Sequence, residues 1–322
     1  MNILVTGATG YIGGAAAKAL RLAGYAVSGL ARSQDAAAKL TQAGLTPVMG
    51  DFADFASLAG AVKHADVVVS TASIGSLSGD TETFRKDRDA VRAMLAALEG
   101  SGKTLIFTSG SAVVGTFADG EASSVVYDEG VSLPLPESVF APDTANVHPM
   151  VVAGFGAAMA ARIETENAVV GATGLKGVVM RPGLVYGDGG SYDIPQLIVL
   201  SRENGIAPHL GSGGTLQGFV HIADLADLFR LAVERAPKGA VLHGVVDEVS
   251  QRDLAAAVSR MIGAGDKTAS FSLEQMFGSL GSVGVSLSLN KRMSTDWTRD
   301  ITGWSPIRTD ILHDVEFGSY AG

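Results

Sequence analysis

Three glycines near the N-terminus have the spacing of a phosphate-binding loop. They stand in the run Thr6-Gly7-Ala8-Thr9-Gly10-Tyr11-Ile12-Gly13, between a short apolar segment and an amphipathic one. In such a loop Gly7 allows a tight turn, Gly10 lets the backbone approach a pyrophosphate, and Gly13 lets a helix pack closely on a strand. The helix start also offers free N–H groups to phosphates; the alternative is a plain glycine turn. We expect a dinucleotide cofactor to contact Gly7, Thr9, Gly10, Tyr11, Ile12 and Gly13.

The residues after the second predicted strand bear on which dinucleotide binds. The run there is Gly29-Leu30-Ala31-Arg32-Ser33. Proteins that bind NAD(H) usually carry an acidic residue at this place, which accepts hydrogen bonds from the ribose hydroxyls. Here the Arg32 guanidinium can pair with a 2′-phosphate at two points, and Ser33 can add a hydroxyl donor. The sequence therefore favours NADP(H) over NAD(H). The alternative is a solvated Arg32, with Asp35 at the ribose.

Two further strand ends carry residues that fit the same cofactor. Asp51 and Phe52 follow the third predicted strand, and the Asp51 carboxylate can accept a hydrogen bond from an adenine amino group. The alternative role of Asp51 is to cap a helix that begins near Asp54. Thr71 and Ala72 follow the fourth predicted strand, at the carboxyl edge where ligands bind in parallel sheets. We expect Asp51, Phe52, Thr71 and Ala72 to contact the cofactor.

Short apolar segments alternate with amphipathic segments over the first part of the chain. Predicted strands cover residues 2–6, 25–30, 46–49, 66–70, 103–108 and 177–181, and predicted helices cover residues 11–23, 54–63, 83–98 and 153–170. This alternation is typical of parallel strands that are covered by helices on both faces. We expect an α/β fold: a Rossmann-type doubly wound parallel sheet with a smaller C-terminal substrate-binding lobe.

The division between the two parts is predicted near residue 187. Residues 1–187 are mainly the dinucleotide-binding Rossmann domain, and residues 188–322 are mainly the substrate lobe. Late Rossmann elements are interleaved with that lobe at about residues 219–246. Residues 110–149 are rich in Gly, Ser, Pro and Asp and lack helical periodicity, and loops of this length are often functional.

Composition excludes several classes of function. The chain of 322 residues has a formal net charge of −9 and no cysteine, which excludes disulfides, thiolate zinc sites and a cysteine nucleophile. Because it is acidic and lacks a basic run, we expect no nucleic-acid partner. Its six histidines are scattered, so we predict no metal site. No signal-like segment or membrane-spanning apolar run is present, which predicts a cytoplasmic protein without a membrane partner.

Several segments together resemble the short-chain dehydrogenase/reductase superfamily, in its extended and atypical branches of NAD(P)-dependent epimerase/dehydratase type. The glycine loop matches the extended type. Further matches are Phe107-Thr108-Ser109-Gly110-Ser111-Ala112, Arg181-Pro182-Gly183-Leu184-Val185-Tyr186-Gly187, residues 219–226 and residues 287–306. The resemblance implies that Ser111 is the family's catalytic serine, although it could be a simple turn residue. It also implies cofactor contacts at Ser109, Pro182, Gly183 and Val185.

One feature of that superfamily is missing. Its members carry a Tyr followed four residues later by a Lys, on the helix after the long loop, and the Tyr exchanges a proton with the substrate. If Glu166 matches the family's downstream Glu, Arg162 falls at the Lys position and Ala158 at the Tyr position. Arg162 could then hold the nicotinamide ribose or polarise a substrate oxygen. Its alternative role is a helical pair with Glu166.

The proton donor is therefore left open by the sequence. His148 precedes the helix and titrates near neutral pH, so it could replace the missing Tyr as a catalytic residue; the alternative is a surface histidine. Tyr127 and Tyr192 are other possible donors. Tyr186 matches a structural position of the family, and His221 is expected to support the substrate pocket.

These features predict an NADP(H)-dependent oxidoreductase that reduces a small organic carbonyl, imine or activated alkene with an unusual proton donor. One alternative is a sugar-nucleotide-type epimerase or dehydratase. The other is a catalytically silent NADP-binding regulatory protein, which the missing Tyr favours. The expected partner is a small-molecule substrate, and the predicted helices 83–98 and 153–170 could pair in a homodimer.

Overall fold

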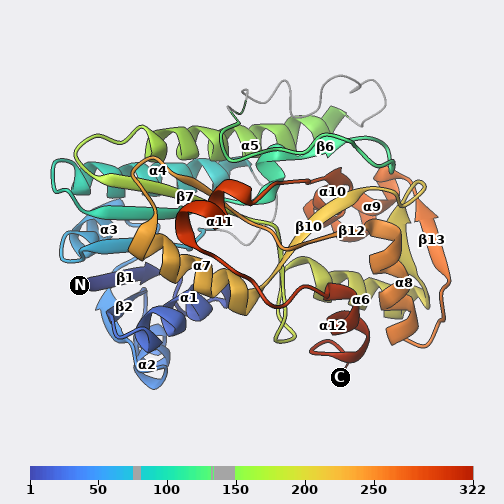
Figure 1. The fold of residues 1–322 in the computed structure, drawn as a ribbon, viewed down its shortest axis with the longest axis horizontal. Coiled ribbons are helices and arrows are strands. Elements are labelled where there is room, and N and C mark those ends of the chain that lie inside the picture. Colours follow the sequence, from blue (N-terminus) through green and yellow to red (C-terminus); the bar gives the residue numbers. More distant parts are fainter. Residues whose placement is uncertain (75–80, 132, 134–148, 322) are drawn as a thin grey trace.

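The computed structural model describes residues 1–74, 81–131, 133 and 149–321. Its main feature is a parallel sheet in the order β11-β7-β5-β4-β1-β2-β3 (Figure 1). The strands are β1 (Asn2–Thr6), β2 (Ala26–Ala31), β3 (Thr46–Met49), β4 (Val67–Ser70), β5 (Thr104–Thr108), β7 (Lys176–Pro182) and β11 (Val241–Gly244). The chain reverses its direction of travel across the sheet between β1 and β4. A crevice for ligands forms at such a point, outside the carboxyl ends of the strands.

Helices cover both faces of this sheet (Figure 1). Helices α1 (Tyr11–Leu22) and α7 (Ile222–Arg235) pack together on one face, and α3 (Phe55–Val62), α4 (Thr81–Leu98) and α5 (Pro149–Val170) cover the other. Alternate side chains of a strand point to opposite faces. Ile3 and Val5 therefore belong to one hydrophobic core, whereas Leu4 belongs to the other. The predicted doubly wound fold is confirmed.

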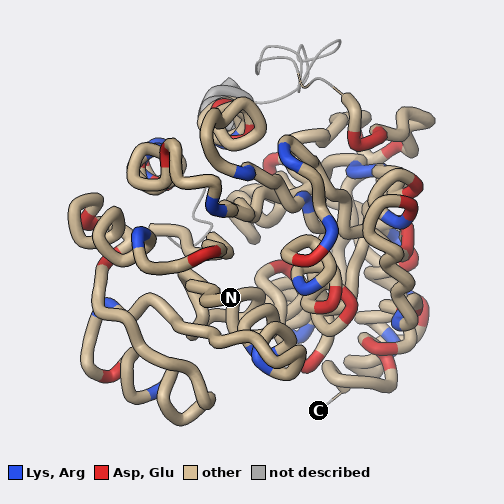
Figure 2. The backbone as a smooth tube through the Cα atoms, turned by 60° about the vertical axis from the view of Figure 1, so that its left-hand side comes forward, with Lys and Arg blue, Asp and Glu red and all other residues tan. Residues whose placement is uncertain are grey.

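Charged residues of both signs lie along the outer helices. Figure 2 shows Lys and Arg positions interspersed with Asp and Glu positions along the described backbone, rather than gathered in one basic stripe. None of the helices in the described part of the chain combines the length and the apolar character that crossing a membrane requires.

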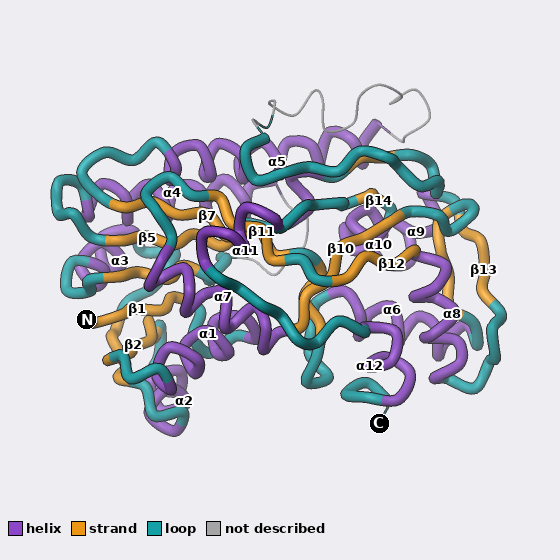
Figure 3. The backbone as a smooth tube through the Cα atoms, in the orientation of Figure 1, coloured by secondary structure: helices purple, strands orange, loops and turns teal. Residues whose placement is uncertain are grey.

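A smaller lobe lies beyond the carboxyl ends of the sheet strands (Figure 3). Its sheet has the order β12-β10-β8, and β13 pairs with β9. The strands are β8 (Leu184–Tyr186), β9 (Ala207–Leu210), β10 (Leu216–His221), β12 (Asp247–Ser250) and β13 (Thr268–Phe271), and the helices are α6 (Asp193–Asn204), α8 (Gln251–Met261), α9 (Leu273–Leu280), α10 (Ser282–Leu287) and α12 (Ile311–Phe317). Tyr186, Phe219 and Met276 lie in its hydrophobic core.

Short elements join the two parts. The 3-10 helix η1 (Ser111–Val114) follows β5 and leads into β6 (Thr116–Phe117), which pairs antiparallel with β14 (Leu289–Asn290). Helix α11 (Asp296–Thr302) lies beside α7 and β11. The chain thus crosses between the large sheet and the smaller lobe several times, and residues distant in sequence meet at the boundary.

Two helices differ from the sequence predictions. Helix α2 (Gln34–Gln42) was not predicted, because only Ala37 and Leu40 are buried and the apolar pattern is short. The apolar pattern of the sequence also predicts a helix near residues 196–203. Helix α6 begins earlier, at Asp193, since Pro195 in the first turn needs no N–H partner.

Candidate active site

Two cavities meet at the glycine loop. The first, here called the Arg32 cavity, has a volume of about 380 Å³, and the second, here called the Arg162 cavity, has a volume of about 440 Å³. Gly7, Gly10 and Thr71 line both. The two cavities therefore form one trough across the carboxyl ends of β1 and β4.

The glycine loop is tightly built. Gly7 has a φ of +74°, a conformation that favours glycine, so its predicted role in a tight turn is confirmed. A Cβ atom on Gly13 would lie 2.3 Å from the Gly7 carbonyl oxygen and 2.4 Å from Thr71 Oγ1. The Thr71 hydroxyl in turn donates to the Thr6 carbonyl oxygen at 2.7 Å. Only glycine at residue 13 lets the helix start this close to the strand ends.

The Arg32 cavity brings together the residues predicted for the adenosine half of a dinucleotide. Its wall includes Thr9, Arg32, Asp51, Phe52 and Ala72, besides the shared Gly7, Gly10 and Thr71. The Arg32 side chain is exposed, and no ion pair to it occurs within the described residues. The guanidinium is thus left available for an anionic group.

Near the Arg32 cavity, the structure corrects the alternative role of Asp51 and gives Ser33 a role that differs from the predicted one. Asp54, not Asp51, caps α3, because its Oδ1 accepts hydrogen bonds from the N–H groups of Ala56 and Ser57. The capping alternative for Asp51 is therefore wrong; its Oδ1 accepts from Ala53 N at 2.9 Å.

Ser33 does not lie in the wall of either cavity. Its Oγ accepts a hydrogen bond from Ala36 N at 3.2 Å and caps α2. The sequence could not show this, because the helix was not predicted.

The Arg162 cavity brings together the predicted nicotinamide and catalytic residues. These are Gly7, Gly10, Tyr11, Ile12, Gly13, Thr71, Ser109, Ser111, Arg162, Pro182, Gly183 and Val185. Its volume is in the range of small-molecule sites in proteins. Phe84, Met159 and Leu184 add apolar surface to the wall.

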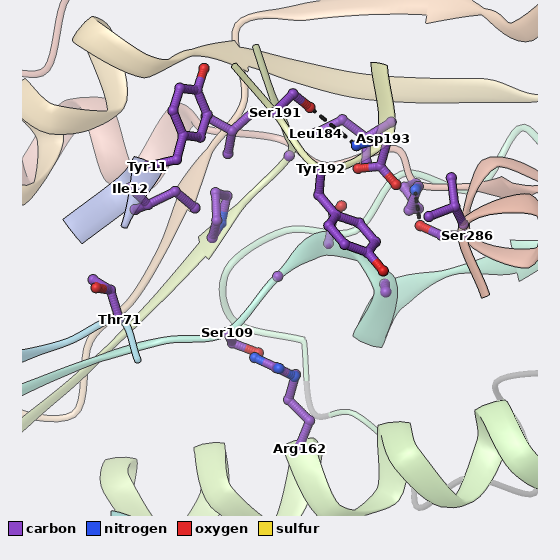
Figure 4. Close-up of a pocket in the computed structure, with 18 of the residues that line it drawn as sticks. Tyr11, Ile12, Thr71, Ser109, Arg162, Leu184, Ser191, Tyr192, Asp193 and Ser286 are labelled. Carbon is purple, nitrogen blue, oxygen red and sulfur yellow. Dashed lines mark hydrogen bonds between the residues drawn. The ribbon is translucent and has the colours of Figure 1, made fainter. Parts of the chain in front are cut away.

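Arg162 reaches the cavity from α5 (Figure 4). Its guanidinium carbon lies 5.0 Å from the centre of the Phe84 ring, and its Nη1 donates to the Thr108 carbonyl oxygen at 3.3 Å. Burial lowers the pKa of Arg162, whereas the charges of Asp87 and Glu166 raise it. Because an arginine keeps its charge in proteins, this group is a fixed cation in the wall and not a proton donor.

The alternative role of Arg162, a helical pair with Glu166, is wrong. The Glu166 carboxylate is taken by Arg181 on β7, with Nη2–Oε2 at 2.6 Å. Only the long-range charge of Glu166 acts on Arg162.

Hydroxyl groups at the end of β5 are left without partners. Thr108 Oγ1 and Ser109 Oγ are buried and make no hydrogen bond within the described residues. Ser109 lies in the cavity wall, as does Ser111, which begins η1 and is also buried. Buried polar groups normally have a partner, so this edge is ready to bind a polar ligand.

The candidate proton donors are placed very differently. His148 lies outside the described residues. The Tyr186 hydroxyl donates to the Arg308 carbonyl oxygen at 3.2 Å, which confirms its structural role. Tyr127 pairs with the Thr116 hydroxyl at 3.3 Å and does not line the cavity. Tyr192 does line it, and Figure 4 shows its ring pointing inward from the side opposite Arg162.

His221 is a helix cap rather than a cavity residue. Its Nδ1 accepts a hydrogen bond from Ala223 N at 3.1 Å, at the start of α7. Its ring lies edge-on to Tyr186, with the ring centres 5.2 Å apart. Burial lowers the pKa of His221, which keeps the accepting nitrogen unprotonated.

A glycine-rich turn after β8 is held from two sides. The Tyr11 hydroxyl donates to the Gly187 carbonyl oxygen at 2.7 Å. The Tyr320 hydroxyl accepts from Gly187 N at 2.9 Å and donates to the Gly190 carbonyl oxygen. The turn leads directly to Ser191 and Tyr192 in the cavity wall, so these contacts set where Tyr192 enters.

Sequence reasoning missed several polar residues of the cavity. Asp193, Ser286 and Lys291 lie in its wall and come from the smaller lobe. No local pattern marks them, since they are brought together by the pairing of β14 and by the start of α6. Within the described residues, no group of three or more metal-ligating side chains occurs.

Comparisons with known proteins agree with this architecture. The profile of the NAD-dependent epimerase/dehydratase family matches residues 3–243. An uncharacterized protein of Schizosaccharomyces pombe is 28% identical over 99% of this chain and all of its own length. A ketoreductase of Stigmatella aurantiaca, named for a farnesyl-dihydroquinoline-oxide substrate, is 30% identical over 75% of this chain and 67% of its own.

Among solved structures, the human epimerase family protein SDR39U1 with NADPH has the same fold. The TM-score is 0.71 at 18% identity, and the match covers 99% of each chain. The glycine loop, the strand-end residues and the matched family profile together lead to one conclusion. The chain belongs to the NAD-dependent epimerase/dehydratase family.

Proposed function

We propose that this protein is an NADP(H)-dependent oxidoreductase that reduces a small organic carbonyl, imine or activated alkene. The observation that carries the proposal is the continuity of the two cavities. A dinucleotide lying across Gly7, Gly10 and Thr71 would have its adenosine end at Arg32 and its nicotinamide end at Arg162. The remaining wall of the Arg162 cavity would then receive the substrate.

The residues present fit such a cofactor. Gly13 lets α1 start close against Gly7 and Thr71, where a Cβ atom has no room, and the unpartnered hydroxyl of Ser109 lies in the cavity wall, where a polar ligand can bind it. The exposed Arg32 suits a 2′-phosphate, which supports NADP(H) over NAD(H). When bound, the reduced nicotinamide would supply a hydride.

The chain itself would supply orientation and electrostatics. The fixed charge of Arg162 stabilises negative charge that develops on a substrate oxygen, and Ser111 orients that oxygen by hydrogen bonding. Phe84, Met159 and Leu184 exclude water from the reacting groups, which strengthens these interactions.

The names of two relatives support a reductive reaction. One is the Stigmatella ketoreductase, and the other is a denitrifying reductase of a Streptomyces species that acts on 3-diazoavenalumate, 29% identical over 77% of this chain. Both names denote reductases. The carbonyl of the proposed substrate class is the group that the name ketoreductase implies.

The test begins with a titration of the purified protein with NADPH and with NADH. Reduced-nicotinamide consumption is then followed with a panel of ketones, imines and activated alkenes. Turnover with tighter NADPH binding supports the proposal. Binding without turnover would favour a regulatory protein, and substrate conversion without net cofactor consumption would favour an epimerase. If neither dinucleotide binds, the proposal is wrong.

A further inference from the structure

The wall of the Arg162 cavity on the side of the smaller lobe contains a buried lysine. Lys291 directly follows β14 and has 0% of its surface exposed. Its Nζ donates a hydrogen bond to Ser286 Oγ on α10 at 3.0 Å. The adjacent Arg292 points away, to Glu248 on β12, with Nε–Oε1 at 2.6 Å. The two neighbouring cations therefore have different partners: Lys291 contacts Ser286 in the cavity wall, and Arg292 pairs with Glu248.

The charge of Lys291 has no close counterion. No carboxylate oxygen of the described residues lies within 4.0 Å of its Nζ. Asp193, in the first turn of α6, is the one described charged group that acts on it noticeably. Burial lowers the pKa of Lys291 to about 8, and the attraction of Asp193 opposes that change. A lysine in this condition can release its proton near neutral pH.

Ser286, the hydrogen-bond partner of this lysine, also lies in the wall of the Arg162 cavity. It is only partly buried, and Figure 4 shows it on the same side of the cavity as Asp193. Because its oxygen accepts a hydrogen bond from the ammonium, its own hydrogen is free to point elsewhere. No described residue accepts a hydrogen bond from Ser286 Oγ, so that hydrogen can be donated to a ligand.

We propose that Ser286 is the catalytic acid of the reduction, and that Lys291, whose positive charge Asp193 favours, is a positioning residue that resupplies its proton. This inference rests on the proposed function. A proton donor outside α5 is needed, because neither Ala158 nor Arg162 can give a proton to the substrate. The acid would then come from the smaller lobe, rather than from α5.

For a carbonyl substrate, the reduction consists of one hydride transfer and two proton transfers. When the carbonyl carbon accepts a hydride from the reduced dinucleotide, the π electron pair of the C=O bond moves to the oxygen. The Ser286 O–H bond breaks as its proton passes to that oxygen. A Lys291 N–H bond breaks as its proton passes to Ser286 Oγ, which leaves a neutral amine that water reprotonates. The oxidised dinucleotide and an alcohol are the products.

Four variants test this assignment in the full chain with NADPH. Ser286→Ala and Lys291→Met should each lower kcat by about 100-fold or more, the usual contribution of a general acid, while NADPH still binds. Lys267→Met, at an exposed lysine outside the cavity, should keep the activity. Tyr192→Phe removes the competing hydroxyl and should cost less than Ser286→Ala. The assignment is overturned if Tyr192→Phe abolishes turnover and Ser286→Ala does not.

The pH profile separates proton supply from a merely structural role. Lys291 holds its proton below its pKa of about 8, so the wild-type reduction rate should fall as the pH rises through that value. Lys291→Met should lack this inflection. Asp193→Asn should move the inflection to lower pH, since the carboxylate favours the charged lysine. An unchanged profile in Lys291→Met would contradict the inference.

A measurement without turnover completes the test. Carbon-13 labelled lysine, observed by NMR in the NADPH complex, should show one resonance that titrates near pH 8 and disappears in Lys291→Met. A midpoint at the ordinary lysine pKa of about 10.4 would overturn the inference. If NADPH is consumed but Ser286→Ala remains fully active, only this inference fails. If NADPH does not bind, the proposed function fails with it.

Discussion

Arg181 on β7 binds the Glu166 carboxylate on α5 at two points, with Nε–Oε2 at 3.0 Å and Nη2–Oε2 at 2.6 Å. Both side chains are almost fully buried, with exposed fractions of 4% and 2%. Arg181 Nη1 also lies 3.3 Å from His243 Nε2 on β11. Since Arg162 stands one helical turn before Glu166, this ion pair fixes the part of α5 that carries Arg162 into the cavity.

Replacing Glu166 should therefore be costly. Glu166→Gln leaves the Arg181 charge buried without a counterion, and such a loss typically costs about 3–5 kcal/mol. The matched control is Glu164→Gln on the same helix, whose partner Arg88 is at the surface, and its cost should stay below about 1 kcal/mol. Urea unfolding monitored by circular dichroism measures both. Equal costs would show that the Arg181 pair does not stabilise the fold.

Acid should destabilise the protein through His243. Burial lowers the pKa of this imidazole from 6.5 to about 4, and the charge of Arg181 lowers it as well, whereas the hydrogen bond between Nδ1 and the Ser294 carbonyl oxygen opposes the change. Between these values the unfolded chain binds a proton that the native imidazole does not bind. The free energy of unfolding should then fall by about 3 kcal/mol from pH 6.5 to pH 4.

The His243→Gln variant tests whether His243 causes this loss of stability in acid. A glutamine keeps one donor and one acceptor but does not titrate, so the slope of stability against pH should become shallower. Part of the slope will remain, because the pKa values of His209 and His221 are lowered in the same direction. The prediction is wrong if His243→Gln keeps the wild-type slope.

Arg32 should determine the cofactor preference. Arg32→Ala should weaken NADPH binding by roughly 10- to 100-fold, the size of a lost charged hydrogen bond, and leave NADH binding nearly unchanged. Arg21→Ala, at an exposed arginine of α1 outside both cavities, serves as the control. Titration by fluorescence or calorimetry at fixed salt concentration gives the dissociation constants. A parallel loss for both dinucleotides would indicate a role other than reading the 2′-phosphate.

Gly13 should tolerate no side chain. In Gly13→Ala the new Cβ would meet Gly7 O and Thr71 Oγ1 at less than 2.5 Å, so the loop must shift at a cost of about 1–3 kcal/mol, and dinucleotide binding should be lost. Gly60→Ala on α3 has no atom within 4 Å of its new Cβ and should instead stabilise the protein by about 0.5–1 kcal/mol. Thermal unfolding and NADPH titration of both variants decide the point.

The cofactor half of the site was predictable because its signals are local. The spacing of Gly7, Gly10 and Gly13 describes a single turn of chain. Thr71 and Ser109 were found because parallel strands all end at the same edge of a sheet, so their neighbours in space follow from the strand order. Ser33 shows the limit of this reasoning, since its partner belongs to a helix with too weak an apolar pattern to predict.

The substrate half depends on contacts between distant segments. Asp193, Ser286 and Lys291 meet only because β14 pairs with β6 and α10 packs beside α6 and α9, and none of this pairing has a sequence signature. Lys291 also stands in a stretch of ordinary composition. A buried lysine is recognised from its surroundings, which a single sequence does not contain.

The hydroxyl of Tyr320 closes the turn that precedes Tyr192, and this makes the segment around Tyr320 part of the support of the Arg162 cavity. Fusion partners and purification tags are therefore better joined before Met1 than after Tyr320. A chain shortened before Tyr320 would keep its parallel sheet, but it would lose one residue of the smaller lobe's core and release the loop that leads to Tyr192. Substitutions at this contact between Tyr320 and the turn could change the shape of the substrate side of the Arg162 cavity and leave the Arg32 cavity unchanged.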